Sequence, residues 1–280
     1  MTSLYTDKVA IVTGGGSGIG EALCLELARR GTRVVVADIN ADNARRVAAA
    51  IGGQATASTV NVASEPEITR LVEDTAAAHG RLDYMFNNAG LAIGGDARDL
   101  TLDHWRRVLD VDLYGVLYGM HAAYPIMARQ GFGHIVNTSS AAAFFPAPGN
   151  APYCTAKHAL VGLSLSLRLE GVDLGVKVSC VCPGFVRTNV YQNAEAVNMT
   201  LPDGMTREQV HGAPAKMMEP ARAAQVILDG VARNRALIVF PASIRWARRA
   251  SFLLPHLGDQ ILLRQMRKSR IYRTAEPVSP

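Results

Sequence analysis

The feature that most constrains the fold is a regular alternation of short apolar segments and longer helical ones. The apolar segments span residues 8–13, 33–38, 55–61, 82–86, 134–138 and 176–181. Between them, apolar residues recur at helical spacing in residues 21–30, 41–51, 65–79, 102–129 and 153–170. Strands that are apolar along their whole length must be covered on both faces. The alternation therefore predicts an α/β fold, a Rossmann-like doubly wound parallel sheet of about seven strands with helices on both faces.

Composition indicates a globular chain in a reducing compartment. Of the 280 residues, 49% are hydrophobic, but no apolar run reaches the roughly 20 residues that a membrane-spanning helix needs. The first eight residues are polar and show no secretory leader pattern. The cysteines have neither metal-ligand nor redox spacing, so we expect small buried residues at Cys24, Cys154, Cys180 and Cys182. These observations favour a cytoplasmic protein with no bound metal.

Positive charge is concentrated at the end of the chain. Residues 241–280 hold eight Lys and Arg against two acidic residues, whereas residues 1–240 are close to neutral. A basic tail suggests an acidic partner or a membrane surface, while a basic body would have suggested nucleic acid. No zinc finger, helix-turn-helix or ribonucleoprotein motif accompanies the tail, so nucleic acid is not an expected partner.

A glycine-rich turn follows the first predicted strand. Its spacing is Gly14-x3-Gly18-x-Gly20, and Ser17 and Ile19 lie inside it. In such a turn the backbone N–H groups at the start of the next helix can approach a pyrophosphate. Taken alone, the turn could also be only a tight connection, although this is the less favoured interpretation.

An acidic residue ends the second predicted strand. Asp38 lies eighteen residues beyond Gly20, where a carboxylate accepts hydrogen bonds from an adenosine ribose and repels a 2′-phosphate. Ile39 and Asn40 follow it in place of Arg or Lys, so the pattern favours NAD over NADP. Capping of the next helix by Asp38 is a competing interpretation, and both can hold together.

Residues 140–157 contain a candidate acid/base unit. Tyr153 has Lys157 four residues on, which places both side chains on one face of a helix. An ammonium beside a phenol favours the phenolate and lowers a pKa that is ordinarily about 10. Ser140, thirteen residues before Tyr153, follows a strand and could help to hold a substrate hydroxyl or carbonyl oxygen. A Tyr and a Lys at this spacing are more often a plain surface pair, so neighbouring motifs decide the interpretation.

Five motifs in this order resemble the short-chain dehydrogenase/reductase family, in its variant of about 250 residues. They are Gly14-x3-Gly18-x-Gly20, Asn87-Asn88-Ala89-Gly90, Ser140, Tyr153-x3-Lys157 and Pro183-Gly184-x3-Thr188. The resemblance covers roughly residues 5–240 and is specific as a set. It implies that the chain is an NAD-dependent oxidoreductase of secondary alcohols, and that it assembles as a homotetramer or homodimer.

The resemblance also implies a role for each motif residue. The glycines, Ser17 and Ile19 would contact the pyrophosphate, Asp38 the adenine ribose, and Asn61 and Val62 the adenine. The dinucleotide would further contact Asn88, Ala89, Gly90, Tyr153, Lys157, Pro183, Val186 and Thr188, the last of these at the nicotinamide. Ser140, Tyr153, Lys157 and Asp112 would form the catalytic set. At least one of Asn87 and Asn88 is instead expected to tie neighbouring strands together.

Two positions depart from the family pattern. Asn61 stands where an Asp commonly bonds the adenine amino group, and its amide carbonyl can accept the same bond. Asp112 stands where the family has a catalytic Asn, and a carboxylate accepts hydrogen bonds but does not donate them. If Asp112 pairs with Lys157, the pKa of Tyr153 stays higher than in the Asn version, and catalysis favours alkaline pH.

The substrate and the tail leave several alternatives open. Residues 189–218 are expected to form a lid that contains four methionines and Tyr191, which suits a lipophilic or aromatic alcohol. An NADP-dependent ketone or 3-oxoacyl-carrier reductase and a non-catalytic NAD-binding protein are the alternatives. Beyond the catalytic domain of residues 1–240, residues 241–280 form a basic amphipathic extension with two expected helices, 244–254 and 258–270. The extension would pack on a neighbouring subunit or over the pocket, or else contact an anionic membrane.

Overall fold

The computed structural model contains the predicted doubly wound sheet. The structure describes residues 4–188, 190, 194–199 and 217–253, and three single residues at 260, 263 and 267. Seven parallel strands lie in the order β3-β2-β1-β4-β6-β7-β9. Their bounds are Val9–Thr13 (β1), Arg33–Asp38 (β2), Ala55–Thr59 (β3), Tyr84–Asn87 (β4), Gly133–Thr138 (β6), Val176–Pro183 (β7) and Leu237–Phe240 (β9). The predicted α/β fold is confirmed, and β9 is the one strand of the sheet that the apolar pattern did not locate.

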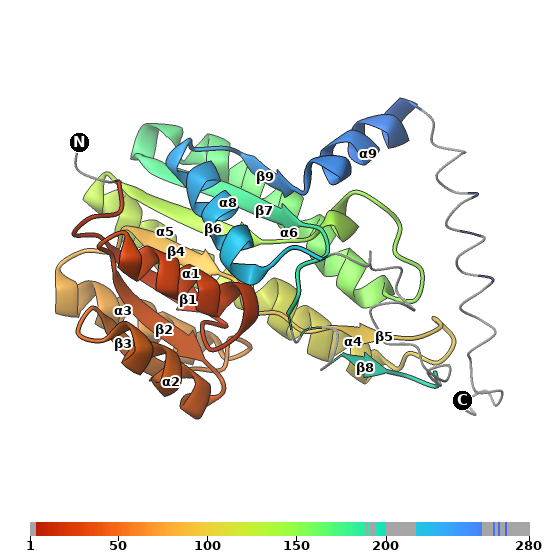
Figure 1. Ribbon diagram of the computed structural model, residues 1–280, viewed down its shortest axis with the longest axis horizontal. Helices are drawn as coiled ribbons and strands as arrows, with labels where there is room; N and C mark the ends of the chain where they lie inside the picture. The colour runs from red at the N-terminus through yellow and green to blue at the C-terminus, as the bar shows by residue number, and fades with distance from the viewer. Residues whose placement is uncertain are drawn as a thin grey trace.

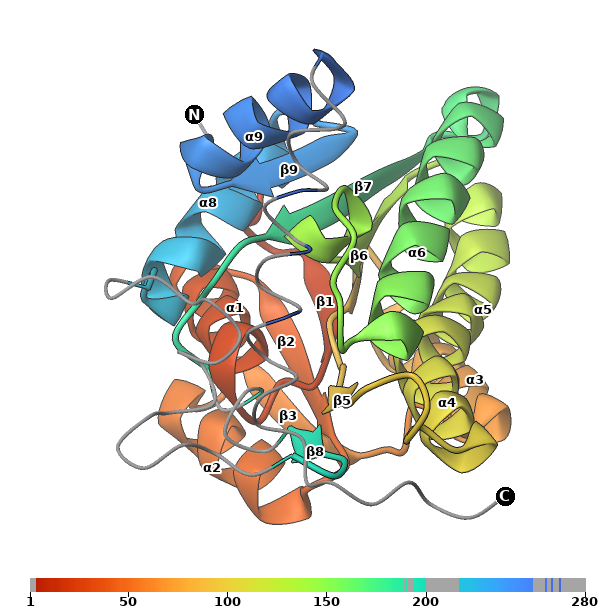
Figure 2. The same ribbon diagram turned by 90° about the vertical axis from the view of Figure 1, so that its right-hand side faces the viewer.

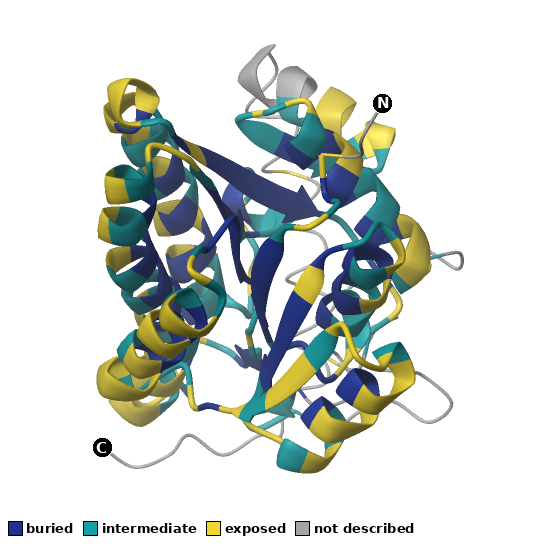
Figure 3. Ribbon diagram, turned by 90° about the vertical axis from the view of Figure 1, so that its left-hand side faces the viewer, coloured by how far each residue is buried: buried dark blue, intermediate teal, exposed yellow. Residues whose placement is uncertain are grey.

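Helices cover both faces of the sheet, as Figure 2 shows. One face carries α1 (Gly18–Arg29), α2 (Ala41–Ile51) and α8 (Pro220–Ala232), and the other carries α3 (Glu65–His79), α5 (Gly115–Gln130) and α6 (Ala151–Glu170). Each face has its own apolar core, built from alternate strand residues and the inner side of these helices. The central strands between the two cores are almost wholly buried, whereas the edge strand β3 is largely exposed (Figure 3). Because both faces are covered, ligands can reach the sheet at its edges and at the ends of the strands, and the carboxyl ends form the usual site.

The long helix expected over residues 102–129 is interrupted. It consists of α4 (Leu102–Leu109), a π-helical segment (Asp110–Tyr114) and α5. A π-helical turn inserts one extra residue, and such turns occur often at functional sites. Asp112 lies in the middle of this segment and is fully buried. The apolar periodicity of the sequence does not reveal a local change of this kind.

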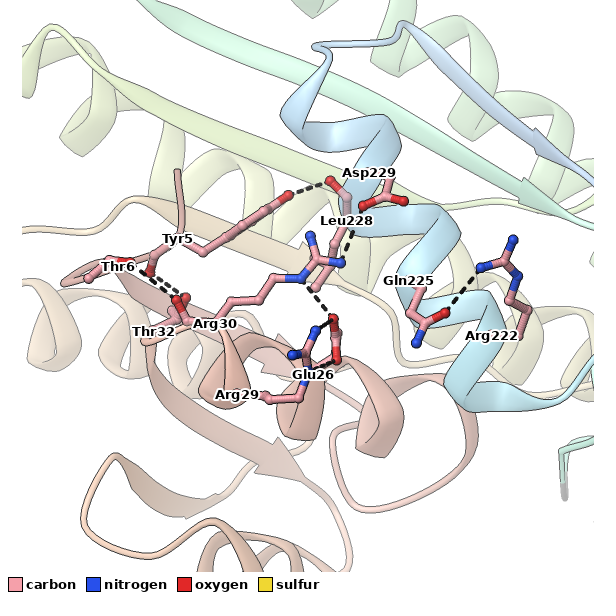
Figure 4. A network of polar contacts seen from close by, with 10 residues as sticks. All are labelled: Tyr5, Thr6, Glu26, Arg29, Arg30, Thr32, Arg222, Gln225, Leu228 and Asp229. Carbon is pink, nitrogen blue, oxygen red and sulfur yellow. Dashed lines mark hydrogen bonds and ion pairs between the residues drawn. The ribbon is translucent and has the colours of Figure 1, made fainter. Parts of the chain in front are cut away.

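A polar network fixes α8 to α1 (Figure 4). Arg30 bridges Glu26 of α1 at 2.8 Å and Asp229 of α8 at 3.2 Å, and its guanidinium lies 5.3 Å from the centre of the Tyr5 ring. The Tyr5 hydroxyl donates a hydrogen bond to the Leu228 carbonyl oxygen. Hydrogen bonds from Arg29 and then Arg30 lower the pKa of the Glu26 carboxyl to about 2, so Glu26 is ionised at neutral pH. The network fixes the element that leads into β9.

A second, two-stranded sheet lies beyond the main one. Here β5 (Ile93–Gly94) pairs in parallel with β8 (Glu195–Ala196). Residues 194–199 therefore pack beside the segment that follows β4, while most of the expected lid lies outside the described residues. The first expected tail helix is present as α9 (Ala242–Leu253), and the second lies outside the described residues apart from three isolated positions. No helix in the described part of the chain has the length and apolar character needed to cross a membrane.

Candidate active site

The predicted site residues surround one cavity at the carboxyl ends of the strands. The cavity has a volume of about 480 Å³. Its lining includes Gly14, Ser17, Gly18, Ile19, Asp38, Asn61, Val62, Asn88, Ala89, Gly90, Asp112, Ser140, Tyr153, Lys157, Pro183, Val186 and Thr188. The sheet order reverses between β1 and β4, and in doubly wound folds such a reversal opens the crevice that binds ligands. Residues from distant parts of the sequence therefore meet where this fold class places its ligand.

The glycine turn brings backbone close to backbone. Gly14 and Gly18 have φ angles of +63° and +55°, a region that residues with a Cβ rarely adopt. Gly20 does not line the cavity, but a Cβ there would collide with the Gly14 carbonyl oxygen. Ser17 is the N-cap of α1 and its side chain makes no capping hydrogen bond. Because the Ser17 side chain does not bond them, the first N–H groups of α1 can bind an anionic ligand at the helix N-terminus.

Asp38 connects β2 to the glycine turn. One carboxylate oxygen accepts a hydrogen bond from the Gly16 N–H at 2.9 Å, and the other accepts one from the Asn40 N–H at 2.9 Å. The cap of α2 is Asn40, whose side chain accepts from the Asn43 N–H at 3.0 Å. The alternative that Asp38 caps this helix is therefore wrong, because Asp38 lies two residues too early. A nearby cation, Arg46, is held by Glu21 at 2.7 Å.

The asparagines after β4 tie strands together, as expected. Asn88 donates from its side chain to the Thr13 carbonyl oxygen at 3.1 Å, which joins the end of β4 to that of β1. Asn87 donates to the Asn137 side chain of β6 at 2.9 Å. The side-chain oxygen of Asn61 accepts the Ala63 N–H at 3.0 Å and keeps one further lone pair for a ligand.

Ser140 and Tyr153 come from consecutive elements. Ser140 follows β6 and is the N-cap of a short 3₁₀ turn (Ala141–Ala143), with its hydroxyl oxygen accepting the Ala142 N–H at 3.2 Å. Tyr153 lies in the first turn of α6, where the hydroxyl of Ser140 forms a hydrogen bond with its own. The two hydroxyls thus face the same part of the cavity.

Lys157 lies one turn after Tyr153 and is almost completely buried. Its Nζ is 5.3 Å from the centre of the Tyr153 ring and donates to the Thr138 carbonyl oxygen at 3.2 Å. The same atom is 3.1 Å from Oδ2 of Asp112, and the two side chains are 4% and 0% exposed. The other Asp112 oxygen accepts the Leu91 N–H at 2.8 Å. The direct pairing of Asp112 with Lys157 is therefore present.

Burial and this pairing set the proton affinity of the site. Burial raises the pKa of the Tyr153 hydroxyl well above its usual range, the Asp112 carboxylate raises it further, and the hydrogen bond from Ser140 opposes both. Burial also raises the pKa of Asp112, against the attraction of Lys157. The expectation that the ammonium of Lys157 lowers the pKa of Tyr153 is thus wrong, because burial and then the Asp112 carboxylate raise that pKa. The expectation that the pairing of Asp112 with Lys157 keeps the pKa of Tyr153 higher than an Asn at position 112 would agrees with the structure.

Residues after β7 close the far side of the cavity. Val186 forms an isolated bridge with Met218, and the Arg187 N–H donates to the Met218 carbonyl oxygen at 2.9 Å. Thr188 reaches across to the glycine turn, where a Cβ on Gly18 would lie 3.1 Å from the Thr188 methyl carbon. Thr188, the residue before the expected lid, therefore lies beside the predicted pyrophosphate position.

Several contacts at the site could not be found from sequence motifs. The Leu91 N–H and the Thr138 carbonyl oxygen hold the buried charges, and backbone groups leave no signature in residue type. Cys154 is half-buried, unlike the fully buried Cys24, Cys180 and Cys182, and its thiol contacts the loop after Ser140. Among the described residues, no group of three or more His, Cys, Asp or Glu is arranged to hold a metal ion.

The cavity fits a dinucleotide. Glycines leave room along the turn, the start of α1 faces the cavity, and Asp38 lies at the end of the neighbouring strand. The buried Lys157 and the partly buried Tyr153 and Ser140 line the same cavity. Fold and site together define a dinucleotide-binding oxidoreductase.

Comparison with known proteins identifies the family. The sequence model of the short chain dehydrogenase family matches residues 8–198. A cyclohexanol dehydrogenase of Acinetobacter sp. (strain SE19) is 38% identical over 203 residues, which are 71% of this chain and 81% of that protein. A putative oxidoreductase, SadH, of Mycobacterium tuberculosis is 34% identical over 242 residues, 85% of this chain and 87% of that one. This chain therefore belongs to the short chain dehydrogenase family.

A solved structure is similar over nearly the whole chain. It is a short chain dehydrogenase/reductase from Burkholderia phymatum in complex with NAD, 25% identical, with a TM-score of 0.81. The alignment covers 99% of this chain and 98% of that one. The similarity extends beyond the residues that the family model matches and includes the strand β9.

Proposed function

We propose that the protein is an NAD-dependent dehydrogenase that interconverts a secondary alcohol and its ketone. The observation that carries the proposal is the convergence of Ser140, Tyr153 and Lys157 on the cavity that also contains the glycine turn. A bound nicotinamide dinucleotide supplies the hydride acceptor at the ring. The chain's own residues supply binding, orientation and the movement of one proton.

Each catalytic side chain has one task in this mechanism. The Tyr153 oxygen takes the hydroxyl proton of the alcohol, because the phenol lies beside Ser140 and can become an anionic base, whereas the Asp112 carboxylate is already paired with Lys157. The Ser140 hydroxyl donates to the substrate oxygen and fixes its distance from Tyr153. Lys157 holds positive charge beside the ring at 5.3 Å and so stabilises the phenolate when it forms. In the reverse direction the Tyr153 phenol returns the proton to the ketone oxygen.

NAD is the proposed cofactor on the strength of Asp38. The carboxylate already accepts two backbone N–H groups, and it lies in the cavity at the end of β2. A 2′-phosphate beside it would bring two negative charges together, whereas a ribose hydroxyl donates to it. Arg46, a nearby cation, is neutralised by Glu21 at 2.7 Å.

Replacing Asp38 with Ser is expected to shift cofactor preference toward NADP. The change removes the repulsion of the 2′-phosphate and a hydrogen bond to the ribose, so kcat/KM for NAD should fall about 10-fold or more while that for NADP rises. Initial rates with both cofactors measure the ratio. Asp42→Ser, on the exposed first turn of α2, is the matched control and should leave the ratio unchanged. A wild-type protein that prefers NADP would overturn the assignment.

The substrate is proposed to be a lipophilic or aromatic secondary alcohol. The walls near Ser140 include Leu91 and Ala92, and the loop after Ser140 carries Phe144 and Phe145. Similarity to a cyclohexanol dehydrogenase supports a ring-shaped substrate. A panel of cyclic, aromatic and linear secondary alcohols, followed by NADH absorbance, tests the class. Activity restricted to NADPH and a 3-oxoacyl carrier would favour the reductase alternative, and NAD binding without any turnover would favour a non-catalytic protein.

The Asp112→Asn variant is expected to oxidise alcohol at lower pH than the wild type. The carboxylate raises the pKa of Tyr153, so an amide in its place lowers that pKa. The rising limb of the profile of log kcat/KM against pH should move down by about 1–2 pH units. Asp110→Asn, at an exposed position of the same π-helical segment, should leave the limb in place. An unmoved limb in Asp112→Asn would show that Asp112 does not act on Tyr153.

A further inference from the structure

The helix α9 begins beside the end of β7. The Gly184 N–H donates to the Phe240 carbonyl oxygen at 2.7 Å, which joins the residue after β7 to the end of β9. A Cβ on Gly184 would lie 3.0 Å from Pro241 and 3.2 Å from the side chain of Ile244. As Figure 1 shows, α9 follows directly from β9, so the start of the helix is fixed next to the cavity residues Pro183 and Gly184.

One turn further on, Arg248 reaches the loop that carries Ser140. Its guanidinium carbon lies 4.4 Å from the centre of the Phe144 ring, within the range of a cation–π contact. Phe144 directly follows the 3₁₀ turn whose N-cap is Ser140. The charge of Arg248 also acts at the end of β7: the pKa of Cys182 is raised by its hydrogen bond with Cys180 and by burial, and the charge of Arg248 opposes that rise.

The same loop is held from its other side by α6. The Cys154 thiol donates to the Ala142 carbonyl oxygen at 3.3 Å and lies 3.7 Å from the Phe145 carbonyl oxygen. Cys154 is the residue after Tyr153. The loop from Ser140 to Phe145 is thus fixed between the helix that carries the tyrosine and the helix α9 of the C-terminal segment.

We propose that Arg248 is a positioning residue for the substrate-binding loop, and that α9 thereby takes part in selecting the alcohol. Arg248 holds Phe144, Phe144 fixes the end of the 3₁₀ turn, and this turn sets where the Ser140 hydroxyl lies relative to Tyr153. The inference rests on the proposed function for its kinetic consequences. It assigns a task to the basic C-terminal extension that needs neither a membrane nor a second subunit.

The test uses the full-length chain with three variants of the contact. Arg248→Met keeps the apolar stem and removes the charge, Arg248→Lys keeps a cation, and Phe144→Leu removes the aromatic face. Loss of a cation–π contact should raise KM for the alcohol by about 3- to 30-fold in Arg248→Met and in Phe144→Leu, with KM for NAD unchanged. Arg248→Lys should recover part of the loss, and the double variant should be no worse than the worse single one.

A second readout does not depend on turnover. Amide hydrogen exchange of residues 142–145 should be several-fold faster in Arg248→Met than in the wild type, with exchange in β1 and β4 unchanged. Arg245→Met, at an exposed position of the same helix, is the matched control and should change neither exchange nor KM. Unchanged exchange of this loop in Arg248→Met, or equal effects in Arg245→Met, would overturn the proposal. Faster exchange in a chain that turns over no alcohol would support the positioning role while the proposed function failed.

Discussion

The Tyr153→Phe variant is expected to lose most of the dehydrogenase activity, with kcat lower by about 10²- to 10⁴-fold or more. The variant removes the oxygen that exchanges a proton with the substrate, a contribution of this size in general acid/base catalysis. It also removes a contact that positions the substrate oxygen beside Ser140. NADH formation under saturating alcohol and NAD measures the effect.

Two controls separate this chemical loss from misfolding. Tyr124→Phe removes a hydroxyl from α5, outside the cavity, and should leave kcat within about twofold of the wild type. In Tyr153→Phe itself, NADH binding should persist, because the aromatic ring and the other dinucleotide contacts remain and the lost hydroxyl acts mainly on the substrate. Retention of most activity in Tyr153→Phe would remove Tyr153 from the mechanism.

The Lys157→Met variant is expected to be less stable by about 3–5 kcal/mol, as well as inactive. Removal of one partner leaves the other as an uncompensated buried charge, and Asp112 is 0% exposed. Burial raises the pKa of Asp112 and Lys157 opposes that rise, so without the lysine the folded-state pKa rises further. When the pKa of Asp112 in the folded protein is above its value of about 3.9 in the unfolded chain, the folded state becomes less stable as pH rises. The free energy of unfolding in denaturant should therefore fall more at pH about 8 than at pH about 5.

A second substitution should restore stability but not activity. In the Lys157→Met, Asp112→Asn double variant there is no buried charge, and the amide oxygen still accepts the Leu91 N–H. Most of the lost free energy of unfolding should return, because no buried charge remains and the amide oxygen keeps its hydrogen bond from the Leu91 N–H. Turnover should remain low, since no ammonium stabilises the phenolate. A Lys157→Met variant as stable as the wild type at pH about 8 would show that the pair is not a stability determinant.

The overall fold was predictable because its signal is repeated along the chain. Buried strands of a parallel sheet are mostly apolar, and five of the strands located from the sequence, β1, β2, β4, β6 and β7, carry this pattern. Even β3, at the sheet edge, was located, although its residues are partly exposed. The seventh strand, β9, is a four-residue apolar run that follows α8, and the expected lid separates it from the regular alternation of strands and helices, so the pattern did not extend to it.

The candidate site was predictable where the chemistry depends on residue type and spacing. Gly14 and Gly18 are needed at positive φ, and Tyr153 and Lys157 must lie one helical turn apart. Their functional roles stay predictions until the variants are measured. The assembly as a homotetramer or homodimer also stays a prediction. The same holds for the boundary at residue 240 between the catalytic domain and the C-terminal extension.

The rest of the site depends on local geometry that residue type does not encode. The π-helical turn at Asp110–Tyr114 contains Asp112, yet the surrounding apolar periodicity is that of an ordinary helix. The contact of Arg248 with Phe144 joins residues about a hundred positions apart in sequence, and either residue alone is an ordinary surface or loop residue. A buried cysteine was expected at Cys154, but its half-buried thiol instead donates to a loop carbonyl.

The pH dependence of alcohol oxidation by the wild-type protein tests the central claim most directly. A tyrosine whose pKa is raised by burial and by Asp112 must lose its proton before it can accept one from the substrate. With NAD saturating, log kcat/KM should rise from pH about 6 to pH about 10, and it should level off only near or above pH about 10. A profile that is flat over the same range would contradict proton transfer by Tyr153 under the control of Lys157 and Asp112.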